Sequence, residues 1–343
     1  MDRHVRPSHP HLPDCLAGPE WFVRVLAVLL ALFCWLGATP VRAQQDASFI
    51  VVDQFNRKIH LGQRAHEKRP VASLTKIATA CVVLDWLEIS RGDQGVLITV
   101  PQQVVQLGRL PSPAGLLPGD QISVRDALAA CLMASDNIAA YTLADFVGRS
   151  VLQRTRGNAD PVAFFVRQMN ILAAKEGMTN TRFSNPAGLD HFRQVPTSTA
   201  ADMARISLYA LEKPAFNFYT RLPQRQISVI RAGQRIPVTL RNNNELLGQF
   251  SIDGVKTGHT QRAGGCIVIS AGRPATVRSG PEGDRIYRHR LVVVVLGSQD
   301  RAGLASALLR DGWGRYDAWL NAGRSVQSAE ELLARPQPVG PTR

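Results

Sequence analysis

The first clear pattern in the chain lies at residues 48–61 (SFIVVDQFNRKIHL), where two apolar stretches flank a polar turn at residues 54–57. β-Branched and aromatic residues bounded by turn-forming residues are typical of strands, so this stretch predicts two strands joined by a turn. Residues 73–88 follow as a run that is apolar on every side, which indicates a helix buried in the middle of the domain. Its predicted end is SRGDQG, residues 90–95.

The rest of the chain predicts a helical middle and a strand-rich end. Helices are expected at residues 124–134, 138–148, 161–178, 198–212 and 302–320, and strands at residues 250–258, 265–271 and 289–297. Strands at both ends with helices between them predict an α/β domain whose sheet joins the two ends of the chain, beside a helical lobe. The tail at residues 323–343 is expected to be a linker or disordered, because it is rich in polar residues, proline and glycine.

An export signal is predicted before the first strand. Residues 25–38 (VLAVLLALFCWLGA) form an apolar run that is short for a membrane span and suits a secretory signal peptide. Val41 and Ala43 stand at the small-residue positions that signal peptidase prefers, so cleavage is expected after Ala43, which leaves a domain over residues 44–322. An uncleaved membrane anchor is the alternative. In either case the domain is exported, to the bacterial periplasm or the outer face of the cytoplasmic membrane.

The strongly basic composition bears on the partners of the protein. The formal net charge is +13 and the pI is about 10.2, which by themselves would permit nucleic-acid binding. Export argues against a nucleic-acid partner, and the chain contains no zinc-finger, basic-zipper or RNP pattern. An arginine-rich, solvated surface is the simpler explanation, and it permits peripheral association with membrane headgroups or anionic wall polymers.

The cysteine and histidine residues indicate neither a disulfide framework nor a metal site. Cys15 and Cys34 belong to the leader, which leaves Cys81, Cys131 and Cys266 in apolar surroundings typical of buried cysteines. Because three is an odd number, at least one thiol is free or pairs between molecules. The eight histidines show no ligand spacing, so neither a metal nor another cofactor is expected.

The first element with possible chemistry is Ser73 followed three residues later by Lys76, in PVASLTKIATA (residues 70–80). Residues three apart share a helix face, so the hydroxyl and the amine can meet. A serine becomes a nucleophile when a base takes its proton, and a lysine can be that base if burial lowers its pKa from about 10.4 toward neutrality. Arginine cannot serve, which is a reason for one of only six lysines to stand here. Taken alone, a serine helix cap beside a solvated lysine remains the simpler explanation.

Two further short elements follow along the chain. SDN, residues 135–137, separates two predicted helices, where a hydroxyl and an amide could project into a cleft or simply cap the second helix. KTG, residues 256–258, lies late in a predicted strand, where a lysine beside a threonine hydroxyl suits recognition of a carboxylate. Each element alone is more often structural than functional.

Together and in this order, S-x-x-K, S-x-N and K-T-G are the combination of β-lactamases and penicillin-binding proteins. From about residue 47 to 320 the chain resembles the D-alanyl-D-alanine carboxypeptidases, the low-molecular-mass penicillin-binding proteins. The likeness extends to three longer segments, residues 116–137, 165–190 and 246–271. It implies the penicillin-recognising serine hydrolase fold, an antiparallel sheet flanked by helices plus a helical lobe.

The resemblance also implies a mechanism. Ser73 would attack the carbonyl between the two terminal D-alanines of a peptidoglycan stem peptide, with Lys76 as general base. Ser135 would relay a proton toward the leaving amine, and Asn137 would hold Lys76 and a substrate amide. β-Lactam antibiotics would act as covalent inhibitors, because their strained amide imitates the D-Ala-D-Ala bond.

The third element supplies substrate recognition in this family. Lys256 would add positive potential, and Thr257 would bind the terminal carboxylate together with its neighbours Gly258 and His259. The N–H groups of Ser73 and His259 would form the oxyanion hole.

Two departures from the family pattern stand out. Asp136 occupies a position that is glycine in many relatives. An arginine that relatives often carry after the last strand corresponds to Leu304, and the nearby Arg301 is the candidate replacement.

Three alternative functions stay open. A D,D-endopeptidase that cuts peptidoglycan cross-links uses the same residues. A class A β-lactamase also shares the three elements but needs a carboxylate in an E-x-x-L-N-like segment, and Glu176 lies outside any such pattern. A non-catalytic wall-binding protein on this fold would be expected to have a broken triad, whereas all three elements are intact.

Overall fold

The computed structural model describes residues 46–108, 110–280 and 283–334. The predicted leader, with its cleavage after Ala43, lies outside these residues, as does the end of the tail from residue 335. Within the described part of the chain, no helix combines the length and apolar character needed to cross a membrane.

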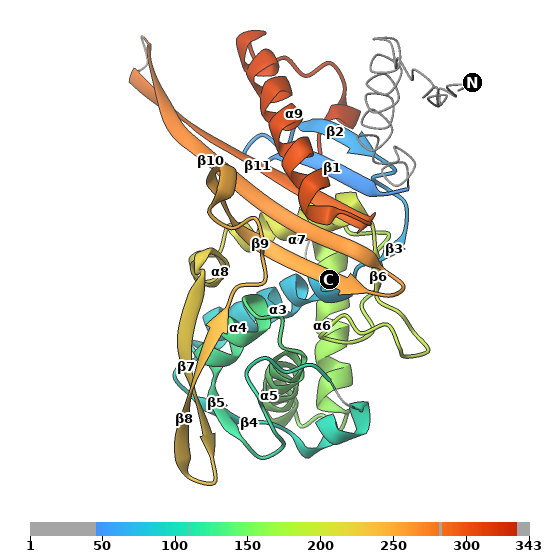
Figure 1. Cartoon of the computed structure of the whole chain (residues 1–343), viewed down its shortest axis with the longest axis vertical. Helices are drawn as coiled ribbons and strands as arrows, with labels where there is room; N and C mark the ends of the chain where they lie inside the picture. The colour runs from blue at the N-terminus through green and yellow to red at the C-terminus, as the bar shows by residue number, and fades with distance from the viewer. Residues whose placement is uncertain (1–45, 109, 281–282, 335–343) are drawn as a thin grey trace, which may run out of the picture. The chain divides into compact units, whose positions relative to one another are not determined.

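A five-stranded antiparallel sheet forms one half of the domain, in the order β2-β1-β11-β10-β9 (Figure 1). Its strands are β1 (Ser48–Asp53), β2 (Ile59–Gln63), β9 (Ile252–Thr260), β10 (Gly264–Gly280) and β11 (Gly283–Ser298). β1 pairs with β11, with Phe49 opposite Val295, so the sheet joins the two ends of the domain as predicted. β9, which carries the K-T-G element, is an edge strand.

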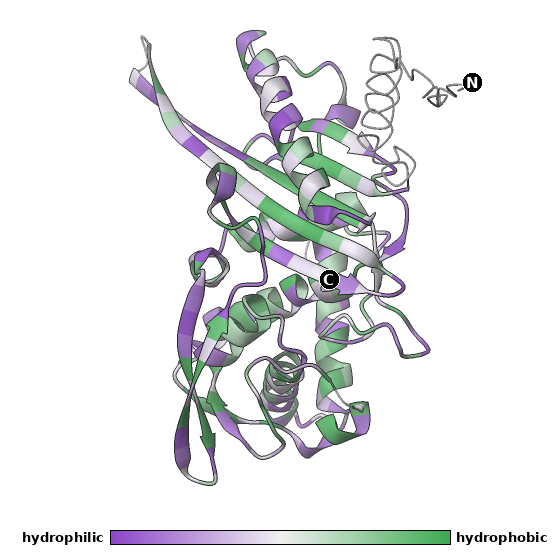
Figure 2. Ribbon diagram, viewed as in Figure 1, coloured by the Kyte–Doolittle hydropathy of each residue, from purple (hydrophilic) through white to green (hydrophobic). Residues whose placement is uncertain are grey.

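The two faces of this sheet pack against different partners. Along β11, Val293 and Val295 face the helix α9 (Arg301–Asn321), in a cluster that includes Trp313 and Tyr316. Val292 and Val294 belong to the second, larger core, which the sheet shares with the helical lobe. Successive residues of a strand point to opposite faces of the sheet. Both faces are buried here, so the sequence of β11 contains a continuous apolar run (Figure 2).

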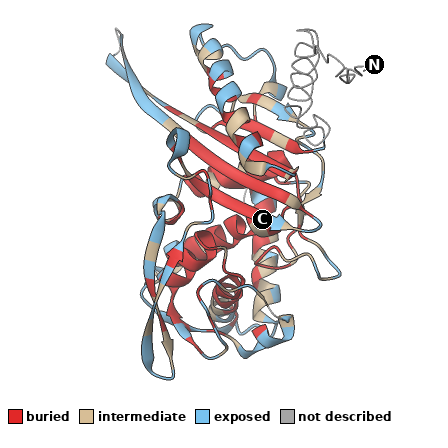
Figure 3. Ribbon diagram, in the orientation of Figure 1, coloured by how far each residue is buried: buried red, intermediate tan, exposed pale blue. Residues whose placement is uncertain are grey.

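The helical lobe surrounds α3 (Thr75–Ser90), whose first ten residues are all buried. This burial explains why residues 73–88 carry no polar face, and Figure 3 shows how much of the lobe is buried. The other helices of the domain are α4 (Val124–Leu132), α5 (Asn137–Thr155), α6 (Pro161–Lys175), α7 (Ala200–Leu211) and α8 (Pro214–Arg221). The prediction of an α/β domain with an antiparallel sheet and a helical lobe is confirmed.

Two small sheets complete the domain. One has four strands in the order β4-β5-β7-β8, which are β4 (Leu97–Thr99), β5 (Gln121–Ser123), β7 (Gln224–Arg231) and β8 (Gln234–Arg241). The other pairs β3 (Arg69–Pro70) with β6 (Thr197–Ser198). The β7–β8 hairpin was not predicted, although apolar residues stand at every second position, Ile227 and Val229 on β7 and Ile236, Val238 and Leu240 on β8.

The prediction of a linker-like tail needs a correction over its described part. Residues 329–331 form a 3₁₀ turn, and Leu333 is 1% exposed. The N–H of Leu333 donates to the carbonyl of Arg57 at 2.8 Å, and Glu331 pairs with Lys58. One buried leucine and one ion pair therefore attach this part of the tail to the β1–β2 turn.

Candidate active site

Ser73 lies in a 3₁₀ turn, Ala72–Leu74, that leads directly into α3. The helix therefore begins two residues later than predicted, yet the expected pairing holds: Lys76 Nζ donates to Ser73 Oγ at 2.9 Å. Lys76 is 0% exposed, and neither the turn nor α3 is capped by a side chain. The explanation as a serine cap beside a solvated lysine is wrong for this site.

The amine of Lys76 has two more partners, both uncharged. Nζ donates to Asn137 Oδ1 at 2.8 Å and to the Ala187 carbonyl at 2.7 Å. A protonated amine can donate to all three oxygens. A neutral amine keeps two N–H groups for Asn137 and Ala187, and its lone pair can then accept the Ser73 hydroxyl proton. The same geometry thus fits both protonation states of a base.

Burial sets the protonation of Lys76. Removal from water lowers the pKa of Lys76 from 10.5 to about 8, against the smaller opposing effects of Cys131 and Asp136. A measurable fraction of this lysine is therefore neutral at physiological pH.

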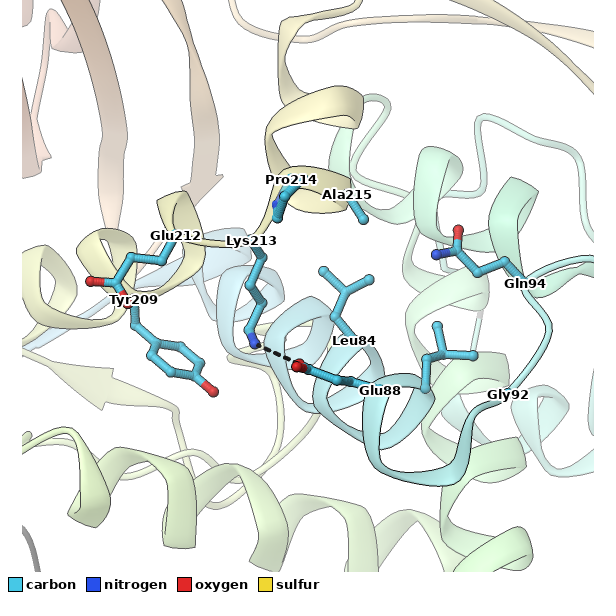
Figure 4. A pocket seen from close by; sticks show the side chains of 10 residues that line it. Leu84, Glu88, Gly92, Gln94, Tyr209, Glu212, Lys213, Pro214 and Ala215 are labelled. Atoms are coloured by element: carbon cyan, nitrogen blue, oxygen red, sulfur yellow. Dashed lines mark ion pairs between the residues drawn. The ribbon is translucent and has the colours of Figure 1, made fainter.

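A cavity of about 520 Å³ at the other end of α3 contains a lysine whose partners, unlike those of Lys76, are charged (Figure 4). Its Lys213 pairs with Asp85 and with Glu88, whereas the partners of Lys76 are uncharged. Glu88 follows Lys76 by twelve residues, which is about 18 Å along a helix at 1.5 Å per residue. This cavity is therefore separate from the Ser73 site.

The SDN turn both caps a helix and contacts Lys76. Asp136 caps α5 by accepting the Ala139 N–H at 2.9 Å, as the simpler explanation predicted, and it also accepts from Ser112 Oγ and the Ala114 N–H. The next residue, Asn137, reaches Lys76. Ser135, just before the cap, has a left-handed backbone with φ of 60°. A tightly held turn thus places the second element beside the first.

Lys256 brings a second buried amine to the same region. It is 1% exposed, and its Nζ donates to the Thr257 carbonyl at 2.8 Å. Burial, reinforced by the charge of Lys76, lowers the pKa of Lys256 to about 7. Lys76 and Lys256 are therefore close enough for the charge of Lys76 to lower the pKa of Lys256.

Gly258 brings the edge strand β9 against the Ser73 turn. A Cβ placed on Gly258 would lie 3.0 Å from the Ser73 backbone N and 3.3 Å from that of Leu74. Glycine therefore favours this close approach, because any larger residue would push the Ser73 turn away. His259 follows as an exposed residue at the open end of the strand. The structure thus brings the Ser73 N–H and the K-T-G strand together.

Arg301, not Leu304, stands beside the K-T-G strand. Its guanidinium donates to the Gly258 carbonyl at 2.9 Å and pairs with Glu245 at 2.8 Å. Leu304 is 6% exposed and packs in the apolar cluster beneath α9.

Several site contacts involve residues that the sequence elements do not predict. Thr79 Oγ1 donates to the Pro186 carbonyl at 2.6 Å, next to the contact of Lys76 with Ala187. The Asn-Pro pair at residues 185–186 is a turn signal, but nothing in it indicates contact with a helix a hundred residues earlier. The three cysteines of the domain, Cys81, Cys131 and Cys266, are free and buried, which confirms the prediction of buried thiols.

Comparison with known proteins identifies the family. The chain matches the family described as D-alanyl-D-alanine carboxypeptidase over residues 38–278. It is 33% identical to the D-alanyl-D-alanine carboxypeptidase DacC of Escherichia coli over 258 residues, 74% of this chain and 56% of that protein. It is 31% identical to a D-alanyl-D-alanine endopeptidase of Pseudomonas aeruginosa, over 65% of this chain and 66% of that protein.

A solved structure shows the same similarity in three dimensions. A serine-to-alanine mutant of the Streptomyces K15 DD-transpeptidase superposes with a TM-score of 0.66 at 25% identity, covering 78% of this chain and 97% of that one. The chain spans between about half and two thirds of the length of the curated relatives named above. The fold and the family expected from the three sequence elements are confirmed.

Proposed function

The chain belongs to the D-alanyl-D-alanine carboxypeptidase family, and from this we propose that it is a serine-type D-Ala-D-Ala carboxypeptidase acting on peptidoglycan stem peptides. One observation carries the proposal. Lys76 Nζ lies 2.9 Å from Ser73 Oγ, fully buried, and its three hydrogen-bond partners are uncharged. This is the arrangement that activates a serine by a neutral lysine.

The reaction proceeds in two halves. Neutral Lys76 takes the Ser73 proton while Oγ attacks the carbonyl carbon of the penultimate D-alanine, and the N–H groups of Ser73 and His259 stabilise the oxyanion. Ser135 passes the proton to the leaving amine, and free D-alanine departs. Water then hydrolyses the Ser73 ester and releases the shortened peptide. Lys76 is again the base in this second half.

The K-T-G strand would bind the substrate. As an edge strand, β9 can pair with an extended peptide through its backbone. Lys256 and Thr257 supply the positive potential and the hydroxyl for the terminal carboxylate. Arg301, through its contact with the Gly258 carbonyl, adds a second charge at this end of the site.

The lowered pKa of Lys76 predicts the pH dependence of acylation. Lys76 must be neutral to accept the Ser73 proton, and its pKa is about 8. The acylation rate at saturating penicillin should therefore rise with pH, level off above about 8, and fall roughly tenfold for each pH unit below it. Rapid-quench kinetics between pH 5.5 and 9.5 would check this. A rate that is constant down to pH 6 would contradict Lys76 as the base.

The proposed function is tested by a time course of intact-protein mass after mixing with benzylpenicillin. We expect a long-lived adduct with the added mass of one penicillin, which is absent in Ser73→Ala because the nucleophile is gone. A fleeting adduct with rapid penicillin consumption would indicate a β-lactamase instead. No adduct on folded protein would favour a non-catalytic wall-binding protein.

The β-lactamase alternative requires a deacylating carboxylate, and its candidate Glu176 stands outside an E-x-x-L-N-like segment. Glu176 ends α6, and the charges that act on it are those of Arg57, Lys175, Glu212 and Asp85. None of these four residues belongs to the three sequence elements of the Ser73 site.

A D,D-endopeptidase is the second candidate, because one relative bears that name. The two activities are distinguished by product. Incubation with a pentapeptide ending in D-Ala-D-Ala should release free D-alanine, whereas an endopeptidase would act preferentially on purified cross-linked dimers and release no D-alanine from the pentapeptide.

We also propose the location and domain boundaries that the leader implies. Cleavage after Ala43 would release a catalytic domain of residues 44–322 to the periplasm or the outer face of the cytoplasmic membrane. The net charge of +13 supports peripheral association with anionic membrane headgroups.

A further inference from the structure

The side chain of Asn185 organises a tight turn next to the site. It is 4% exposed, and its Oδ1 accepts three backbone N–H groups, those of Ala187 at 3.1 Å, Gly188 at 2.7 Å and Leu189 at 3.0 Å. Its Nδ2 donates to the Leu189 carbonyl at 2.8 Å. Four hydrogen bonds from one side chain thus determine the conformation of residues 185–189, which we call the Asn185 turn.

The Asn185 turn packs directly against α3 and the nucleophile. Thr79 Oγ1 donates to the Pro186 carbonyl, and Lys76 Nζ donates to the Ala187 carbonyl. Gly188 has a φ of 82°, and a Cβ on it would lie 1.9 Å from the Ala72 carbonyl oxygen and 3.0 Å from the Ser73 backbone N. The Asn185 turn therefore has little freedom to shift without moving Lys76 or Ser73.

We propose that Asn185 is a positioning residue for the acylation step, acting through the Ala187 carbonyl on the amine of Lys76. The inference rests on the proposed function. A neutral amine has two N–H groups and one lone pair, and only when Asn137 and Ala187 accept both N–H groups does the lone pair face Ser73 Oγ. If the Ala187 carbonyl moves away, the amine can rotate and donate to Ser73 Oγ, which removes it as a base.

Asn170 provides a matched comparison on the same segment. Its Nδ2 donates to the Phe183 carbonyl at 2.8 Å, and its Oδ1 accepts the Phe183 N–H at 2.9 Å. It therefore holds the chain two residues before Asn185, and its hydrogen bonds reach neither the Asn185 turn nor Lys76. A residue that only holds the segment in place should behave like Asn170.

The test compares Asn185→Ala, Asn170→Ala and wild type in the full-length protein. Acylation by benzylpenicillin is followed by rapid quench and intact-protein mass, which separates the maximal acylation rate from the half-saturating concentration. Asn185→Ala should lower the maximal rate by about 10- to 100-fold, because small misplacements of reacting groups cost that much, with little change in half-saturation. Asn170→Ala should acylate within about twofold of wild type, although both variants lose thermal stability.

Asn185→Asp adds a rescue. Its carboxylate can still accept the three N–H groups, so at alkaline pH, where Lys76 is neutral, it should recover most of the rate lost in Asn185→Ala. If Asn185→Ala does not fold, Asn185→Ser replaces it, because the serine hydroxyl can still accept one N–H, and an intermediate rate is expected.

The outcomes distinguish this inference from the proposed function. A folded Asn185→Ala or Asn185→Ser protein that acylates as fast as Asn170→Ala overturns the positioning role and leaves the proposed function standing. A wild-type protein that forms no adduct overturns the proposed function, and the positioning role with it. A rise in half-saturation at unchanged maximal rate also overturns the inference, since it would place Asn185 in substrate binding.

Discussion

Replacing Lys76 by arginine should abolish acylation of Ser73, with a fall in rate of about 10³-fold or more. Arginine keeps the positive charge but cannot be deprotonated in a protein, so Ser73 loses its base. The site also has no room for a guanidinium. Lys76 is fully buried, and its single nitrogen meets three oxygens at 2.7–2.9 Å. The measurement is the rate of penicillin adduct formation by intact-protein mass.

Lys213→Arg is the matched control for this substitution. Lys213 lies at the other end of α3 and pairs with Asp85 and with Glu88, contacts that an arginine can preserve. Figure 4 shows the pair with Glu88. We expect Lys213→Arg to acylate at the wild-type rate. A Lys76→Arg protein that forms the adduct as fast as Lys213→Arg would show that Lys76 contributes charge rather than base catalysis.

Gly188→Ala should be the most destabilising single-methyl change in the site. The new Cβ would lie 1.9 Å from the Ala72 carbonyl oxygen and 2.4 Å from the carbonyl carbon, both rigid backbone atoms. The φ of 82° adds strain for any residue with a Cβ. The two effects together should cost about 3–5 kcal/mol in the free energy of unfolding. Acylation should fall as well, because the clash separates the Asn185 turn from the Ser73 backbone. Urea unfolding and penicillin adduct formation measure the two effects.

Gly233→Ala separates backbone strain from the clash. Gly233 also has a positive φ, 79°, but a Cβ there would meet nothing within 4 Å. It should therefore cost only about 1–2 kcal/mol, from backbone strain alone, and leave acylation unchanged. Equal losses of stability in the two variants would mean that the chain near Gly188 relaxes around the extra methyl group.

The strands and helices with long apolar runs were predicted, and several shorter elements were not. β1, α3 and α9 were expected close to their observed positions, because each buries a contiguous apolar run or a periodic face, and β2 was expected as the partner of β1 across a turn. The hairpin β7–β8 and the attachment of the tail were missed. The hairpin has a short apolar alternation at Ile227 and Val229, and both the hairpin and the tail depend on partners elsewhere in the chain.

The sequence alone determined the family and the fold class, and it provided Ser73 and Lys76 as the proposed reacting pair. Ser73 and Lys76 are three residues apart, so a single turn of chain brings them together, whatever the rest of the domain does. The family resemblance already implied the contact of Asn137 with Lys76, and only the tertiary structure revealed the other partner, the Ala187 carbonyl, 111 residues away. It also decided the lowered pKa of Lys76 and the placement of Arg301 beside Gly258. The physical reason is that burial and long-range hydrogen bonds are properties of how segments pack, which no local spacing of residues specifies.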